Sequence, residues 1–543
     1  MTDIVIRDAA DVPAVGSMAS TDTMLIVTGD GEVRRAPQLA VGDYVGLDIG
    51  TATRTTTGSV VGSFTRTLNE RDRLWLSPRD LGATGAGTGD DKQIMLDLLE
   101  VAHELGVPNI MLDGDFRVEG SLPITRPIRL FGRNADYDRL HLDIDPTMPG
   151  LFINASDVAV ENLEIRVATP DTIANGQGHN NTCITIGEWF NPAGLTPVER
   201  VALRNLRLTR TSTSGSGHAI AIVGRVSGVS GDNLSFLGGG TLSTTGRHGS
   251  GILAHWGGQS SGVRVAADPA YPLIQYKFAP GCYSHHPNNL RFRGLFARNT
   301  SRLIQLSAVY GVTVDGFDMD GGVDGGQLFD LVSGDEGDWF AHPEDKGRVY
   351  SDISMRNGIA RNLTGAGTGA NSVIDITGFT TSKQLLRDLD AYASAPYGAE
   401  HYAGKVAPIY RMPTNFGLAF ENIDFDGGPR VELVDVTEYR GAISIRTFNG
   451  NLTFKNIKAR GNQGNLALQM ANATGVISFE DCELYGGIEL DEVSQPKFIN
   501  CLMKVPPYPV IQVVLNGTSA AWPLGATITG ALSGARGELI EKV

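Results

Sequence analysis

A short pattern of apolar and polar positions recurs along most of the chain, from about residue 110 to about residue 505. It runs apolar, any, apolar, any, Asn or Gly, apolar, any, apolar, as in residues 158–165 and 201–208. Alternating apolar residues indicate a strand with one buried face. At the fifth position two outward residues follow one another, so the chain must turn there. Asn, Gly and Asp tolerate the left-handed backbone of such a bend. The predicted corners are Asn162, Asn205, Gly294, Gly316, Asn422, Asn456, Asp481 and Asn500.

Two short strands joined at a corner, repeated many times, describe part of one rung of a parallel β-helix. The last two corners, Asp481 and Asn500, are close enough for a single rung, and the wider gaps elsewhere imply inserted loops or missed rungs. Cys482 and Cys501 take equivalent places in successive rungs, and we expect a stacked, buried thiol pair there and no disulfide. The fold class is therefore all-β, a single-stranded right-handed parallel β-helix.

One amphipathic helix precedes the first rung, over residues 91–105. Asp90 is placed to cap it, with Gln93 completing a capping box, and Gly106 ends it. A β-helix exposes strand edges at its ends, and this helix is placed to cover the first of them. Its apolar positions share one face; they are Ile94, Met95, Leu98, Leu99, Ala102 and Leu105.

Pattern changes divide the chain into three domains. Residues 1–70 read as a small β-rich module with a hairpin, because Met24–Val27 and Val33 flank a turn at residues 29–31. Residues 71–505 hold the helix and the rungs. Residues 506–543, which follow a break at Pro506, read as a short C-terminal β module.

Composition narrows the function classes. The chain has 543 residues, 68 of them Gly, with 41% hydrophobic and 19% charged residues, which excludes disorder for most of its length. A formal net charge of −15 argues against general binding to nucleic acid or an anionic membrane. The sequence has no apolar stretch of about 18 residues and no secretory signal, so no membrane insertion is expected. Four cysteines without a CxxC pair argue against a zinc–thiolate site.

The glycine-rich loop over residues 80–91, with the helix after it, resembles the segment that opens pectate-lyase-like β-helix proteins, commonly bacteriophage tailspikes and capsule depolymerases. Ala86 and Gly89 depart from the usual loop. Residues 11–13, 19–27 and 33–36 resemble the anchor regions of phage tail and spike proteins.

This resemblance implies a homotrimer, made in the host cytoplasm and displayed as a spike on the virion surface. Residues 1–70 would contact other virion structural proteins, and the partner outside would be a capsular or other host surface polysaccharide. The leading interpretation is a tail or head spike that attaches the particle to that polysaccharide. A polysaccharide depolymerase, either a hydrolase or a lyase, is one alternative. A purely structural spike base that anchors another fibre is a second.

Candidate polysaccharide-binding residues concentrate in the long gap over residues 247–289, because sugar rings stack on exposed aromatic side chains and hydrogen-bond to polar ones. As a lyase, the chain would draw its base and its carboxylate-neutralising group from Arg247, His255, Tyr283 and His286. The alternative is a long loop packed at a trimer contact. The binding candidates are Arg247, His255, Trp256, Tyr283, His285 and His286, together with Trp339 further on.

Glycoside hydrolysis needs two carboxylates, and an acidic loop supplies Asp335, Glu336 and Asp338 as catalytic candidates. The alternative is a solvated acidic loop. Calcium is the one cofactor with candidate ligands, and these are Asp318, Asp320 and Asp324.

Overall fold

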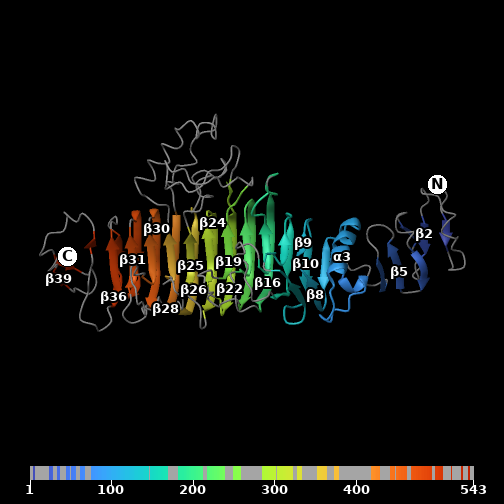
Figure 1. The fold of residues 1–543 in the computed structure, drawn as a ribbon, viewed down its shortest axis with the longest axis horizontal. Helices are drawn as coiled ribbons and strands as arrows, with labels where there is room; N and C mark the ends of the chain where they lie inside the picture. The colour runs from blue at the N-terminus through green and yellow to red at the C-terminus, as the bar shows by residue number, and fades with distance from the viewer. Residues whose placement is uncertain are drawn as a thin grey trace, which may run out of the picture.

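A computed structural model describes the chain over residues 75–145, 147–168, 181–191, 193–211, 217–238, 249–258, 284–300, 302–321, 327–332, 351–363, 372–377, 417–427, 441–446, 448–460, 466–471, 473–491 and 496–504. It also gives the backbone of short strands near both termini. The fold is a right-handed parallel β-helix, as predicted, and its strands stack along the long axis of the molecule (Figure 1).

Two parallel sheets form the walls of this β-helix. We call the 17-stranded sheet the long-strand sheet and the 12-stranded sheet the short-strand sheet. The long-strand sheet contains β7 (Asn109–Leu112), β8 (Asp115–Glu119), β10 (Arg129–Gly132), β11 (Arg139–Asp143), β13 (Val158–Glu161), β14 (Glu164–Ala168), β16 (Val198–Arg210), β18 (Val226–Leu237), β22 (Asn288–Arg298), β24 (Tyr310–Asp320), β26 (Ile353–Leu363), β28 (Gly417–Gly427), β30 (Asn449–Arg460), β32 (Thr474–Glu480), β33 (Glu483–Tyr485), β35 (Lys497–Ile499) and β36 (Leu502–Lys504).

The short-strand sheet runs beside it, one strand per rung. Its members are β9 (Leu122–Ile124), β12 (Leu151–Ile153), β15 (Ile184–Gly187), β17 (Ile220–Val223), β19 (Ser250–His255), β23 (Arg302–Ser307), β25 (Gln327–Val332), β27 (Ile374–Thr377), β29 (Ile443–Arg446), β31 (Leu466–Ala471), β34 (Gly487–Asp491) and β37 (Leu515–Asn516).

Every predicted corner residue has a positive φ, between 51° and 79°. The pattern missed two further corners, Asn233 (φ 54°) and Asn357 (φ 60°). The corner amides bond to one another along the stack, for example Asn205 Nδ2 to Asn162 Oδ1 at 2.8 Å and Asn456 Nδ2 to Asn422 Oδ1 at 2.8 Å.

The two missed corners share a cause. In each rung a glycine stands where the pattern requires an apolar side chain, Gly231 two residues before Asn233 and Gly358 directly after Asn357. A Cβ on Gly231 would come within 2.6 Å of the Phe292 ring, and one on Gly358 within 2.0 Å of the Phe317 ring. Phenylalanines of neighbouring rungs therefore fill the space that a side chain at each glycine would need. The apolar residue lies in another part of the chain, so the local pattern is interrupted.

Aromatic rings form a continuous column in the C-terminal half of the core. Phe420, Phe454, Phe479 and Phe498 stack face to face, with centroids 5.1, 4.7 and 5.0 Å apart along the column. These phenylalanines come from successive rungs of the long-strand sheet, so parallel register alone brings like residues together.

The predicted helix is α3 (Lys92–Glu104), and it lies at the N-terminal end of the stack (Figure 1). It buries Met95, Leu98, Val101 and Ala102 against the first rungs. The predicted capping box is wrong. Asp91 is the N-cap and makes no side-chain cap bond, whereas Asp90 Oδ1 accepts the Lys92 N–H at 3.0 Å. The Gln93 amide instead donates to Asp97, one helical turn away.

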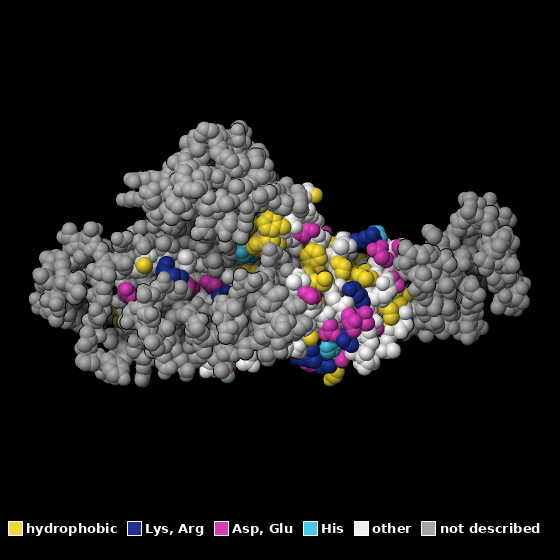
Figure 2. Space-filling model, in the orientation of Figure 1, with side chains coloured by type: hydrophobic (Ala, Val, Ile, Leu, Met, Phe, Trp, Pro, Cys, Tyr) yellow, Lys and Arg dark blue, Asp and Glu magenta, His cyan; other side chains and the backbone are white. Residues whose placement is uncertain are grey.

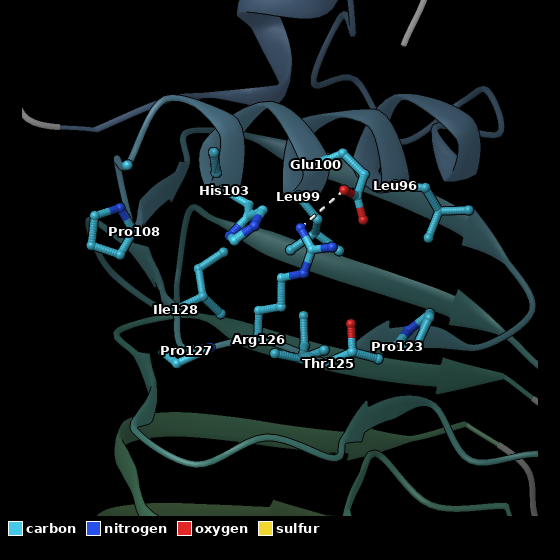
Figure 3. Close-up of a pocket in the computed structure, with 13 residues that line it drawn as sticks. Leu96, Leu99, Glu100, His103, Pro108, Pro123, Thr125, Arg126, Pro127 and Ile128 are labelled. Atoms are coloured by element: carbon cyan, nitrogen blue, oxygen red, sulfur yellow. Dashed lines mark hydrogen bonds and ion pairs between the residues drawn. The ribbon is translucent and has the colours of Figure 1, made fainter. Parts of the chain in front are cut away.

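A hollow of about 290 Å³ lies between α3 and the turn that follows β9 (Figure 3). The Arg126 guanidinium crosses it to Glu100 of the helix, with Nη1 and Oε2 3.0 Å apart. Before the helix, the 3-10 turn η3 (Pro78–Leu81) is capped by Ser77. This end of the β-helix is thus closed by the helix and by an ion pair.

Short strands flank the β-helix in sequence. β1 (Ile4–Ile6) pairs with β2 (Met24–Val27), which forms the predicted hairpin with β3 (Val33–Ala36). β4 (Tyr44–Asp48), β5 (Thr51–Thr56) and β6 (Gly62–Thr67) form an antiparallel sheet, and β38 (Thr527–Thr529) pairs with β39 (Arg536–Glu538). The domain boundaries at residues 70 and 505 stay predictions. In the described part of the chain, no helix is long and apolar enough to cross a membrane.

Cys482 and Cys501 occupy equivalent corner positions of successive rungs, and both are free thiols, as expected. Cys482 is buried and Cys501 is half-buried. Each sulfur lies against a core carbonyl, that of Phe454 for Cys482 and that of Phe479 for Cys501.

Candidate functional site

The outer face of the long-strand sheet carries a column of alternating charge, which we call the charge ladder. Its members lie in register, one per rung, just before each corner. Three of its contacts are ion pairs of 2.6, 2.7 and 2.9 Å. The column therefore neutralises itself. The ladder is Glu161, Arg204, Asp232, Arg293, Asp315, Arg356, Glu421, Lys455 and Glu480.

Side chains of both signs also lie interspersed over the rungs that follow α3, without a broad field of one sign on the face that Figure 2 shows. Arg129 contacts Glu161 at 2.7 Å and Arg139 contacts Glu164 at 2.8 Å. Burial opposes ionisation of Glu164, but hydrogen bonds from Thr209 and Arg166 and the charge of Arg166 outweigh it and lower its pKa. These carboxylates are structural partners of arginine.

The outer face of the short-strand sheet has a different character. The strands pair in register, so one outward residue of each rung lies beside that of the next. Most members of this column are buried or half-buried. In chain order they are Thr185, Ala221, Leu253, Gln305, Asp330, Asp375, Ser444 and Gln469.

Two carboxylates stand side by side in that column, and we call Asp330 and Asp375 the carboxylate pair. Asp330 lies between the core residues Phe329 and Leu331, so its side chain points away from the core. Asp375 alternates with core isoleucines in the same way, and the two aspartates are register partners on β25 and β27. Neighbouring strands are about 4.8 Å apart. The exposed fractions are only 8% and 4%.

An arginine lies on each side of the carboxylate pair. Arg302 Nη1, one rung earlier, is 3.1 Å from Asp330 Oδ2. Arg446 Nη2, one rung later, is 3.4 Å from both carboxylate oxygens of Asp375 and 3.1 Å from Thr377 Oγ1. The charges of the two arginines balance those of the two aspartates. The shorter of the contacts is the one between Arg302 and Asp330.

Aromatic rings gather on the same outer face, and we call Trp189, Phe190, His255 and Trp256 the aromatic end. Trp189 packs over the outward residues Ala221 and Leu253. Its ring centroid is 4.2 Å from that of His255 and 5.0 Å from that of Trp256. Phe190 is 40% exposed.

The loop after β15 presents Trp189 and Phe190, and polar contacts fix its geometry. The Glu188 carboxylate accepts bonds from Asn154 Nδ2 at 2.6 Å and from the Thr196 N–H at 3.2 Å. The backbone at Phe190 pairs with Gly258 of β20 (Gly257–Gly258), where a Cβ would come within 2.4 Å of the Phe190 ring. A side chain at Gly258 would therefore displace the aromatic end.

The aromatic end and the carboxylate pair lie along one line. β19, which carries Leu253 and His255, is followed in the sheet by β23 and then by β25. Two strand spacings of about 4.8 Å separate Leu253 from Asp330. Across the strands of this sheet the rings come first, then Gln305, then the buried carboxylates.

The structure places four of the predicted binding residues in this region. His255 is half-buried in the aromatic end, and β20 pairs with β21 (Ser284–His285) through Gly257 and His285. Trp256, His285 and His286 are 4%, 6% and 2% exposed, about as buried as Asp330 and Asp375. Their binding role stays a prediction.

The remaining predicted site residues fall in other places. Asp318 contacts Arg298 at 3.2 Å and Arg361 at 2.9 Å, and Asp320 Oδ1 accepts a bond from Asn362. Burial opposes ionisation of Asp318, yet the bonds from both arginines lower its pKa overall. Among the described residues no group of acidic, His and Cys side chains is arranged to hold a metal ion, and calcium stays a prediction. Outside the described residues lie Arg247, Tyr283, Asp324, Asp335, Glu336, Asp338 and Trp339.

Sequence reasoning missed Trp189, Phe190 and both members of the carboxylate pair. Trp189 and Phe190 lie in a short gap between rungs, whereas the prediction considered aromatic residues in the long gaps alone. Asp330 had a local signal, because it is the one acidic residue in the apolar run of β25.

No protein-family model and no curated protein sequence matches the chain. Several solved β-helix structures are similar. The Streptococcus pneumoniae surface adhesin PfbA is 12% identical with a TM-score of 0.47, over 81% of this chain and 99% of that one. The tailspike protein of the E. coli bacteriophage HK620 is 11% identical with a TM-score of 0.40, over 81% and 80%. An alpha-1,3-glucanase of Streptomyces thermodiastaticus is 11% identical with a TM-score of 0.33, over 82% and 68%. These proteins are an adhesin, a tailspike and a glucanase, and similarity to them does not identify one function.

Proposed function

We propose that the chain is a spike protein that binds a host surface polysaccharide along the outer face of the short-strand sheet and hydrolyses it with Asp330 and Asp375. The observation that carries this proposal is the register pairing of the two aspartates in line with the aromatic end. Hydrolysis of a glycosidic bond requires one carboxyl group as acid and a second as nucleophile or base.

The spacing favours a retaining mechanism. The backbones of register partners on adjacent parallel strands are about 4.8 Å apart, which allows the roughly 5 Å between carboxyl groups that retaining enzymes use. Inverting enzymes need about 6.5–9.5 Å, because a water molecule must fit between the carboxylate and the sugar.

The arginines suggest how the two roles divide. Arg302 is the closer guanidinium, at 3.1 Å, and it stabilises the charged form of Asp330, which suits the nucleophile. Asp375, whose contacts to Arg446 are 3.4 Å long, is then assigned as the acid that gives a proton to the leaving oxygen. Asp375 would then deprotonate the water that hydrolyses the glycosyl–enzyme intermediate.

A second candidate, binding without cleavage, is favoured by the same arginine contacts. Two aspartates fully engaged by two guanidiniums also describe a structural ion network. In that case the aromatic end would supply the affinity and the carboxylate pair would only hold the rungs.

Asp330→Asn and Asp375→Asn test the proposal, with Asp424→Asn as the matched control. Asp424 lies on the long-strand sheet and is ion-paired with Arg460. Purified protein is incubated with polysaccharides extracted from candidate hosts, and retention on the polymer, new reducing ends and ultraviolet absorbance of unsaturated products are followed. We expect each site variant to lose at least about 10²-fold in reducing ends while it still binds. Wild-type rates in both site variants would refute hydrolysis at this pair, and an unsaturated product would indicate a lyase.

The virion setting rests on the resemblance of residues 1–70 to phage anchor regions. We propose a homotrimer on the virion surface whose N-terminal module contacts other virion proteins. Analytical ultracentrifugation of the full chain should give three times the 57.8 kDa chain mass. A monomer at micromolar concentration would contradict the trimer.

A further inference from the structure

An unpaired guanidinium lies inside the β-helix at the end of β16. Arg210 is 6% exposed, and its Nη1 donates to the Gly217 carbonyl. Its Nε and Nη2 atoms are fully buried and have no hydrogen-bond partner in the structure among the described residues. A guanidinium keeps its charge in proteins, so it cannot relieve this state by losing a proton at neutral pH.

A small cavity of about 10 Å³ adjoins this side chain. Gly217, Gly238, Ser250 and Thr300 are among the residues that line it with Arg210. Ser250, 2% exposed, has a buried Oγ that also lacks a partner among the described residues. Two unsatisfied donor groups, one of them charged, therefore line the same enclosed space.

Among the described residues that line the cavity, none supplies the missing negative charge. Its lining contains no carboxylate. Cys183 interacts with Arg210, but burial raises the pKa of the Cys183 thiol to about 12, which keeps it neutral at pH 7.

We propose that Arg210 and the Ser250 hydroxyl bind a monoatomic anion of the chloride type in this cavity. An ion buried without a partner carries a desolvation penalty of several kcal/mol. A bound anion offsets this penalty, whereas a neutral water molecule offsets only part of it. The volume suits one water-sized particle. Phosphate, sulfate and sugar carboxylates are too large for it.

Such an ion would tie together rungs that support the proposed site. Arg210 ends β16, and Ser250 begins β19, the strand that carries Leu253 and His255 of the site face. Ser250 is also the register partner of Arg302, which contacts Asp330. The anion site itself does not depend on the proposed catalytic function.

The test uses the full chain in sodium chloride, sodium bromide and sodium gluconate at equal ionic strength. Crystals grown in bromide should show one anomalous peak beside Arg210, and the halide buffers should raise the thermal unfolding temperature above that in gluconate. Arg210→Met should lose both the peak and the halide effect. Arg200→Met, at an exposed arginine paired with Asp157, should keep both.

Ser250→Ala provides a second test in case Arg210→Met does not fold. It should weaken the effect of halide on the unfolding temperature and raise the half-saturating halide concentration about tenfold. A water molecule with no anomalous signal in the cavity would overturn the proposal. An unfolding temperature that responds equally to halide in wild type and in Ser250→Ala would also count against it.

Discussion

The two sheets of this β-helix have the same strand pairing but opposite outer faces. On the long-strand sheet the charge ladder alternates in sign at every rung, and the arginines of its ion pairs are exposed, as at Arg356 (48%), although the Glu161 carboxylate is buried. On the short-strand sheet, Arg302 and Asp330 form a pair of similar length whose side chains are 9% and 11% exposed. Burial is what separates the two faces, and burial sets the cost of losing a partner.

The difference indicates how each face is used. Opposite charges on directly paired residues of neighbouring rungs stabilise the observed stacking. If one rung were left out of the stack, like charges would be paired instead. The charge ladder thus specifies how the rungs stack while contributing little free energy per pair. The buried carboxylate pair has no comparable advantage for stability, because desolvation offsets the attraction, and this supports a functional role for it.

The largest expected effect is on the buried ion pair. Arg302→Met leaves Asp330 without its closest guanidinium, and we expect a loss of about 3–5 kcal/mol in the free energy of unfolding. Arg356→Met removes an exposed partner of equal chemistry and should cost at most about 1 kcal/mol. Denaturant unfolding of both variants measures the difference. Equal losses would mean that burial does not distinguish the two faces.

The next effect concerns exposed aromatic rings on the two faces. Phe190 of the aromatic end is 40% exposed, and Phe296 on the long-strand sheet is 38% exposed. Phe190→Ala should weaken polysaccharide binding by roughly 1–3 kcal/mol, as loss of an anchor aromatic does. Phe296→Ala, which loses only its contact with Arg298, should leave affinity unchanged. Isothermal titration with the bound polysaccharide compares them, and equal affinities would move the binding face elsewhere.

A smaller effect is expected from breaking the alternation of the charge ladder. Asp315→Arg would place three positive side chains in consecutive rungs, between Arg293 and Arg356. Like charges directly opposite one another should cost up to about 1 kcal/mol for each pair. The loss of unfolding free energy should shrink as salt rises, because exposed charges are screened. A loss that does not depend on salt would show that packing, and not charge, is responsible.

The smallest effect is chemical and leaves the fold intact. A hydrogen bond with Cys482 lowers the pKa of the half-buried Cys501 thiol to about 7, whereas that contact and burial raise the pKa of Cys482. The thiolate is the reactive form. Iodoacetamide should therefore modify Cys501 first, slowly below pH 7 and at a constant rate well above it. Peptide mass spectrometry against Cys501→Ser identifies the site, and preferential labelling of Cys482 would reverse the assignment.

Local chemistry alone was enough to predict the corners and the helix. A corner at Asn, Gly or Asp can be recognised in the sequence wherever the strand positions around it are apolar. Each corner predicted in this way has a positive φ. The corners at Asn233 and Asn357 were missed because the space beside each is filled by a ring from another rung. The capping box failed because Gln93 finds a partner in Asp97 instead of the helix start.

The candidate site, in contrast, could not be predicted from local chemistry. Residues 333–373 separate β25 from β27 in the chain, and no pattern within that separation indicates that Asp330 and Asp375 are register partners. Trp256 looks like an exposed ring in sequence, next to His255, yet it is 4% exposed beneath Trp189 and Phe190 and also packs with the core cluster.

The sequence by itself determined that this chain coils into a β-helix, where its rungs turn, and that a helix covers its first strands, because these follow from periodicity and from the conformations that single residues tolerate. Only the tertiary structure decided which outward residues become neighbours across rungs and which of them lose contact with water. Those two properties depend on the lengths of the inserted loops and on the stacking register, and they place two carboxylates, two arginines and an aromatic cluster on one face.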